Sequence, residues 1–152
     1  MQEFLKSCRM KNNVVKYTDA VLLAVQIILS AIIAFSRDEI PTHWNYWGEI
    51  DSSGSSYTIL LLSLINILLF VLFNWLKKHP ERCNFPRPFK NREAAYAAMK
   101  ALVTSVSIFI NVIFLFITLS VLLGHMYVAV FNIIMILFLI VIVGSIAKVA
   151  IS

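Results

Sequence analysis

One short segment of the chain holds most of the polar side chains that could do chemistry. His43, Asn45, Glu49 and Asp51 stand close together, and His125 lies much later in the sequence. An imidazole and carboxylate oxygens can together hold a divalent metal ion. One interpretation is therefore a metal site formed by His43, Glu49, Asp51 and His125. No His-x-His or His-Glu-x-x-His spacing accompanies these residues.

Two other interpretations of this segment stay open. In the first, the imidazole of His43 bonds a backbone carbonyl or Asp51 and so locks the fold of a loop. In the second, the segment is a surface that recognises an extracellular peptide or a lipid headgroup. Pro41 is expected to fix a turn just after the preceding helix. Three aromatic side chains suited to the membrane–water interface accompany these residues, namely Trp44, Tyr46 and Trp47.

A second set of polar side chains consists of single amides inside long apolar stretches: Gln26, Asn66, Asn111 and Asn132. Amides in such positions usually join membrane helices, at perhaps 0.6 kcal/mol per hydrogen bond. Alternatively, they form a polar layer along the path of a solute or a lipid. No ionisable residue is expected deep in any apolar stretch, which argues against a proton-relay pump.

The elements that carry these residues are four apolar stretches, at 17–36, 57–76, 101–123 and 127–147. A helix needs roughly 20 apolar residues to cross a bilayer, and barrel strands would alternate apolar and polar residues instead. The chain of 152 residues is 60% hydrophobic and only 14% charged, whereas soluble domains carry about 25% charged residues. We predict an all-α integral membrane protein, with residues 1–152 forming a single domain of four transmembrane helices.

Charged residues predict which side of the membrane each loop faces. Segment 37–56 is acidic, whereas segment 77–100 is strongly basic. Basic short loops mark the cytoplasmic side, so both termini and loop 77–100 are predicted to be cytoplasmic and 37–56 to face outward. The expected location is the inner (cytoplasmic) membrane of a bacterial cell. The net charge of +5 is assigned to anionic lipids at the basic loop, and no nucleic-acid partner is expected.

The third helix is predicted to begin before its apolar stretch. Asn91 is a suitable N-cap, so the helix should run from residue 91 to residue 123. A stripe of small residues is expected to face neighbouring helices, since small side chains let membrane helices approach closely. Its members are Ala94, Ala98, Ala101 and Ser105.

The outward segment contains the pattern Pro-x-His-Trp-Asn-x-x-Gly-x-x-Asp, formed by Pro41, His43, Trp44, Asn45, Gly48 and Asp51. This pattern resembles the signature of a small bacterial membrane domain of unknown function, found in the N-terminal part of SdpI-type immunity proteins. The likeness covers roughly residues 18–120. It implies a non-enzymatic membrane protein that protects against a toxic peptide or senses an envelope signal. Residues 40–51 would be its outward recognition element or lid.

Two other functional classes compete with this one. A glycine-rich phosphate loop, a Gly-x-Ser-x-Gly elbow and a zincin motif are all absent from the sequence, so we expect neither catalytic residues nor a cofactor. The first competitor is a small carrier or lipid-handling protein, which four helices would build as a homo-oligomer around the amide layer. The second is a metal-dependent membrane enzyme that uses the metal site described above.

Overall fold

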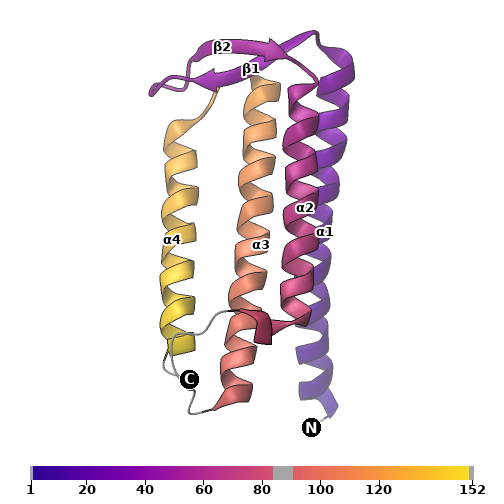
Figure 1. Ribbon diagram of the computed structural model, residues 1–152, viewed down its shortest axis with the longest axis vertical. Coiled ribbons are helices and arrows are strands. Elements are labelled where there is room, and N and C mark those ends of the chain that lie inside the picture. Colours follow the sequence, from indigo (N-terminus) through magenta and orange to yellow (C-terminus); the bar gives the residue numbers. More distant parts are fainter. Residues whose placement is uncertain (1, 84–90, 151–152) are drawn as a thin grey trace.

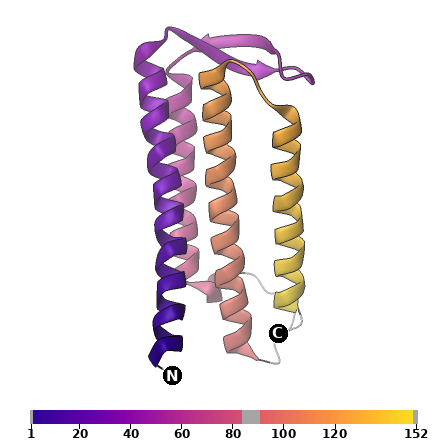
Figure 2. The ribbon, with the colours of Figure 1, turned by 180° about the vertical axis from the view of Figure 1, so that it is seen from behind.

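The computed structural model describes residues 2–83 and 91–150, with side chains described for 17–83 and 91–147. The elements in chain order are α1 (Gln2–Ser36), β1 (Glu39–Trp44), β2 (Ile50–Ser55), α2 (Thr58–Lys78), the 3₁₀ turn η1 (Pro80–Arg82), α3 (Arg92–Leu123) and α4 (Val128–Ala150). The helices run side by side, and β1 and β2 lie across one end of them (Figure 1). The beginning of α1 and the end of α4 lie at the opposite end (Figure 2).

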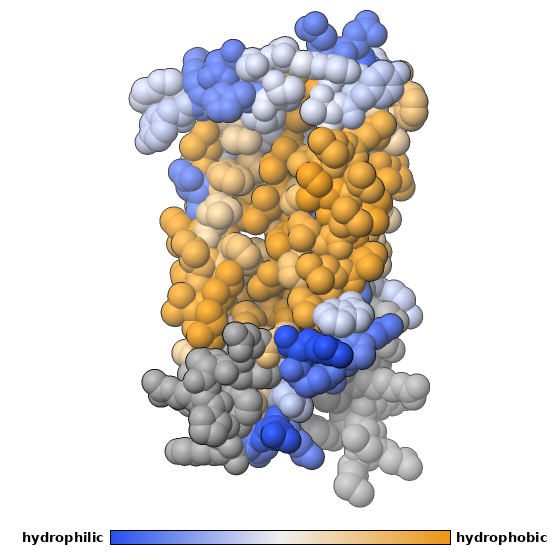
Figure 3. Space-filling view, viewed as in Figure 1, coloured by the Kyte–Doolittle hydropathy of each residue, from blue (hydrophilic) through white to orange (hydrophobic). Residues whose placement is uncertain are grey.

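Four helices are long and apolar enough to cross a membrane. Their apolar parts are Tyr17–Ser36, Thr58–Lys78, Arg92–Leu123 and Val128–Ala147. The surface of these parts forms a broad apolar band, and polar atoms gather at both ends of the molecule (Figure 3). The predicted set of four spanning helices is confirmed, and the chain is a multi-pass membrane protein.

Helix α3 lies at the centre of the arrangement. It packs against α1, α2 and α4, whereas α4 packs chiefly on α3. Two aromatic pairs hold α4 in place: Phe109 with Phe138 and Phe116 with Phe131, at centroid distances of 5.4 and 5.8 Å. No side chain in the described part of α4 is fully buried. Helices α1, α2 and α3 therefore form the core, and α4 is a peripheral helix.

Both ends of α3 are capped by residues whose types explain the boundaries. The side chain of Asn91 accepts a hydrogen bond from the Ala94 N–H, which confirms the predicted N-cap. Gly124 ends the helix with φ +70°, a left-handed conformation that glycine adopts without strain.

The predicted stripe of small residues on α3 is wrong in its position. Ala94 and Ala101 are exposed, and the inward face passes through Ala95, Ala98 and Val103 instead. Further along the helix this face carries Ser107, Asn111 and Thr118, all buried. Because these polar side chains need hydrogen-bond partners inside the bundle, they fix the rotation of the helix more strongly than alanines do.

The segment after α1 folds as an antiparallel hairpin. Register shifts between Pro41 and His43 and between His43 and Trp44 mark an irregular β1. The predicted turn at Pro41 is therefore wrong: Pro41 lies inside β1, and the chain reverses at 45–49. A two-stranded sheet tolerates proline because each strand has an unpaired edge. The hairpin covers a small apolar cluster at the helix ends, formed by Ile33, Ala34, Ile40, Ile59 and Val121.

Candidate functional site

Asn45 organises the turn of the hairpin. Its side-chain Oδ1 accepts hydrogen bonds from the backbone N–H of Trp47 at 2.9 Å and of Glu49 at 3.0 Å. Its backbone N–H donates to the Glu49 carbonyl at 2.8 Å, and its Nδ2 donates to Glu49 Oε2 at 3.0 Å. A short side chain that bonds its own backbone a few residues ahead stabilises a tight turn. Asn45 is therefore a structural determinant of the loop.

Gly48 joins the hairpin to the connection between α3 and α4. Its carbonyl accepts a hydrogen bond from the Met126 N–H at 3.1 Å. Its φ is +82°, and a Cβ at this position would lie 2.0 Å from the Met126 carbonyl oxygen. Only glycine fits both the backbone angle and the close approach. The hairpin tip is thus fixed against the start of α4.

The stem of the hairpin is joined to the helix ends by polar contacts. Arg37 donates from Nη1 to the Val121 carbonyl at 3.2 Å and from Nη2 to the Leu122 carbonyl at 2.9 Å. These carbonyls lie in the last turn of α3, where no intrahelical donor is available. Just after β2, the hydroxyl of Ser56 donates to the Ala34 carbonyl at 3.0 Å. The hairpin is therefore attached to α1 and α3 at its stem and to the α3–α4 connection at its tip.

His43 and Asp51 form a pair across the two strands. Nδ1 of His43 lies 2.5 Å from Oδ1 of Asp51, and the two side chains are 68% and 43% exposed. The pair corresponds to the interpretation in which the imidazole bonds Asp51. Within the described residues, no group of three or more His, Cys, Asp and Glu side chains is placed to hold a metal ion. The geometry thus does not bring His43, Glu49, Asp51 and His125 together as a ligand set.

The three aromatic residues of the hairpin have different surroundings. Trp44 packs against the apolar cluster beneath the hairpin, and its indole N–H is buried without a hydrogen-bond partner among the described residues. Tyr46 and Trp47 at the tip are 80% and 73% exposed, with their rings edge to face at a centroid distance of 5.2 Å. The tip therefore presents two large aromatic side chains outside the bundle.

A second candidate site lies inside the bundle and is centred on Asp19. This carboxylate is 2% exposed and accepts three hydrogen bonds from α2 and α3. The donors are Lys77 Nζ at 2.8 Å, the Ser107 hydroxyl at 2.7 Å and Asn111 Nδ2 at 2.7 Å. The Lys77 side chain is 19% exposed. Asp19 thus joins three helices through one buried charge that is fully paired.

The amides extend this network toward the hairpin end. Asn66 donates from Nδ2 to Asn111 Oδ1 at 3.1 Å and to Gln26 Oε1 at 3.4 Å. Gln26 Nε2 lies within hydrogen-bond distance of three hydroxyls, those of Ser30, Ser63 and Thr118, at 3.0 to 3.2 Å. We call the whole set the polar network: Asp19, Gln26, Ser30, Ser63, Asn66, Lys77, Ser107, Asn111 and Thr118.

One detail of the network differs from what the sequence predicts. Asn132 is exposed on α4 and does not join the other three amides. The expectation that no ionisable residue lies deep in a span stays a prediction, because Asp19 is buried but is the third residue of the first candidate span, Tyr17–Ser36. Asn66 Oδ1 is buried without a hydrogen-bond partner among the described residues.

Sequence reasoning missed Asp19 and Lys77 because each stands near the end of its apolar stretch, where a charge is usually solvated. One signal was available. The two helices are antiparallel neighbours, so a residue near the start of the first faces a residue near the end of the second. An acidic residue and a basic residue at these two places are candidates for an ion pair.

Residues 21–67 match a protein family described as "Domain of unknown function (DUF1648)". The matched segment contains the whole hairpin together with Gln26, Ser30, Ser63 and Asn66 of the polar network. The predicted likeness to a membrane domain of unknown function is thereby confirmed for this part of the chain. No curated protein and no solved structure matches the chain.

The basic loop 77–100 is described only in part. Lys77, Lys78 and Arg82 lie on one side of residues 84–90, and Arg92 and Lys100 lie on the other side. The prediction that this loop binds anionic lipids also covers residues 84–90, which lie outside the described residues.

Proposed function

We propose that this chain is a non-enzymatic bacterial inner-membrane protein of the SdpI-like kind, which uses its hairpin as an outward recognition element. It would protect the membrane from a toxic peptide or sense an envelope signal. The observation that carries the proposal is the construction of the hairpin. Asn45 and Gly48 hold the tip in one position, while Tyr46 and Trp47 remain exposed there. A preorganised loop with exposed aromatic side chains is well suited to binding.

Charge supports the proposed orientation of the chain. Asp38, Glu39, Glu49 and Asp51 lie at the hairpin end, and the described basic residues of 77–100 lie at the opposite end. Basic short loops mark the cytoplasmic side, so the hairpin would face outward and the termini inward. A fluorescent protein fused to the C-terminus would fluoresce under this orientation, because such a fusion folds in the cytoplasm and not in the periplasm.

The function is tested by a survival assay in a susceptible bacterium that expresses the chain. Cells are challenged with a panel of membrane-active peptides, and survival is compared with that of cells without the chain. Wild type should raise survival, and the Tyr46→Ser/Trp47→Ser variant should remove this gain. Tyr17→Ser is the matched control, because Tyr17 is also an exposed aromatic residue, at 64%, but lies in the middle of α1, at the end of its candidate span away from the hairpin. Equal loss in the control would contradict a specific role of the tip.

A second candidate function, a small carrier, is favoured by the polar network. Asn66 has an unpaired, buried oxygen at the centre of the network, and the partly exposed Lys77 joins the network from the last turn of α2. A hydrogen-bonding solute such as glycerol would find a partner at Asn66 Oδ1. Purified protein in liposomes should then speed glycerol entry, measured by light scattering. Asn66→Leu should abolish the effect, whereas Asn74→Leu, an amide outside the network, should not.

A further inference from the structure

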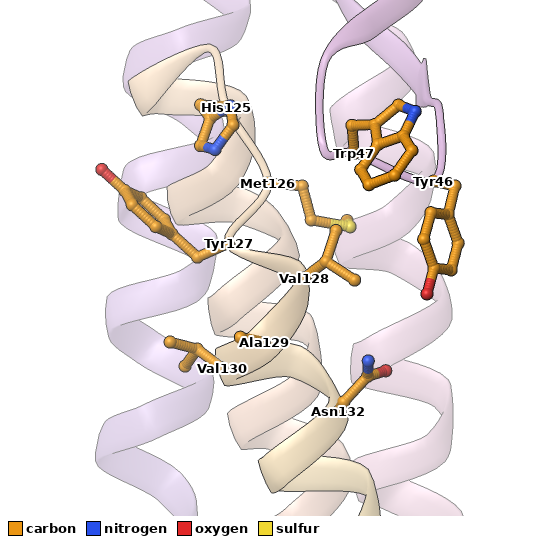
Figure 4. A pocket seen from close by; sticks show the side chains of 9 residues that line it. All are labelled: Tyr46, Trp47, His125, Met126, Tyr127, Val128, Ala129, Val130 and Asn132. Atoms are coloured by element: carbon orange, nitrogen blue, oxygen red, sulfur yellow. The ribbon is translucent and has the colours of Figure 1, made fainter.

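A cavity lies between the hairpin tip and the beginning of α4. Its volume is about 430 Å³, and it is lined by Tyr46 and Trp47 of the tip and by 125–130 and Asn132. Figure 4 shows that Met126, Val128 and Asn132 point to the same side of α4 as the two aromatic residues, whereas His125 and Tyr127 point to the other side. The cavity thus has an aromatic wall, an apolar floor and one amide below them.

Membrane lipids are expected beside the cavity. It lies at one end of a helix that is long and apolar enough to cross the bilayer, and no side chain in that span is fully buried. Tyrosine and tryptophan prefer this depth of the membrane, at the boundary between acyl chains and headgroups. The molecule available to this cavity at the highest concentration is therefore a bilayer lipid.

The polar groups around the cavity are mostly hydrogen-bond donors. The tip contributes the Tyr46 hydroxyl, and α4 contributes the first N–H groups of 128–130, which have no carbonyl partner within the helix. None of the lining residues is acidic. Such a set favours a ligand rich in acceptor oxygens, and negative charge is stabilised at a helix N-terminus.

Asn132 gives an independent reason to expect a ligand. Its side chain is exposed on α4 and makes no hydrogen bond within the part of the chain that the structure describes. An amide that faces the bilayer without a partner costs free energy. In Figure 4 its amide group lies below Tyr46, whose hydroxyl points toward that level of α4. A lipid in the cavity would bring ester oxygens to this amide.

We infer that the cavity binds one phospholipid, with the phosphate at the hairpin tip and the first turn of α4 and the ester oxygens at Asn132. The acyl chains would continue along the apolar surface of α4. This inference deepens the proposed function and rests on it, because it names a partner of the same hairpin tip. The protein would then present its recognition element together with a bound lipid.

The experiment measures lipid retention by native mass spectrometry of the protein purified from detergent. The probes are phosphatidylglycerol, a phosphate-free galactolipid and inorganic phosphate, each added to delipidated protein. Wild type should retain one phosphatidylglycerol per chain. Asn132→Leu and Tyr46→Phe should each weaken its binding about tenfold, as expected for the loss of one hydrogen bond to a charged or buried group. The matched control is Asn74→Leu, since Asn74 lies on α2 away from the cavity and donates to the Phe70 carbonyl.

Three results would overturn the inference. Equal binding of the galactolipid would show that the phosphate is not recognised, and binding of inorganic phosphate alone would show that a lipid is not required. Unchanged retention in both cavity variants would show that the lipid binds elsewhere. This readout is separate from the survival assay. If wild type retains the lipid but gives no protection, the proposed function of the tip fails and the lipid site stands. If the cavity variants keep lipid but lose protection, the lipid site fails and the function stands.

Discussion

The hairpin and the polar network are both built from polar side chains, yet they use them in opposite ways. In the network, Asp19, Gln26, Asn66 and Asn111 are at most 2% exposed, and nearly every polar atom has a partner on another helix. In the hairpin, most polar bonds stay within the loop, and the side chains of Tyr46 and Trp47 are exposed.

This difference suggests that the polar network serves stability and that the hairpin serves recognition. A buried hydrogen bond in a membrane has no water to replace it, so changes in the network should unfold the bundle. A bond on the hairpin surface competes with water, so most changes there should act locally. If this comparison holds, the network keeps the helices together and the hairpin is free to contact a partner.

The largest expected effect comes from breaking the buried ion pair. Asp19→Leu leaves Lys77, Ser107 and Asn111 without their acceptor, and removing one partner of a buried pair costs about 3–5 kcal/mol. The midpoint of thermal unfolding in detergent should fall sharply. Asp19→Leu/Lys77→Met removes both charges and should recover part of the loss. If the double variant is no more stable than Asp19→Leu, the pairing does not explain the effect.

The second-largest effect is expected at Gly48, where the hairpin contacts the connection between α3 and α4. Gly48→Ala forces a Cβ against the Met126 carbonyl oxygen at a positive φ, at a local cost of about 2–3 kcal/mol. Hydrogen exchange should rise at residues 45–49 and at Met126, while the amides of α1, α2 and α3 stay protected. Gly144→Ala is the control, because a Cβ there meets nothing within 4 Å. Faster exchange throughout the bundle would break the comparison.

Two asparagines in the spanning helices, one inside the polar network and one outside it, test this comparison. Asn66→Leu removes hydrogen bonds to Gln26 and Asn111 and should lower the free energy of unfolding by about 1–2 kcal/mol. Asn132→Leu, on the exposed face of α4, should change it little in lipid-free detergent. Chemical denaturation of both variants measures the difference. Equal losses would mean that the network has no special role in stability.

The smallest effect is expected at the surface pair of the hairpin. His43 and Asp51 are both well exposed, and exposed pairs contribute about 0.2–1 kcal/mol. A double-mutant cycle with His43→Ala and Asp51→Ala should therefore give a small coupling energy, measured by thermal unfolding. Metal analysis of the purified wild type and of His43→Ala belongs to the same experiment. One bound ion per chain, lost in His43→Ala, would replace the loop interpretation by a metal site.

The sequence was a good guide to the outward motif, because its residues act within a short stretch of chain. Asn45 and Gly48 were recognised from their positions, and the structure gives each a defined contact. The predicted turn at Pro41 was wrong, since the turn depends on how β1 pairs with β2. In a hairpin the register is set by the turn type and the loop length, and here that turn is the one that Asn45 and Gly48 build at 45–49.

The sequence by itself determined the four spanning helices and the N-cap of α3, because bilayer thickness and helix capping act on short, contiguous stretches. Only the tertiary structure decided which polar side chains meet. Asp19 is far from Lys77 and Ser107 along the chain, and Asn132 resembles Asn111 in sequence context but faces outward. The rotation of each helix in the bundle selects its partners, and that rotation is a property of all the helices together.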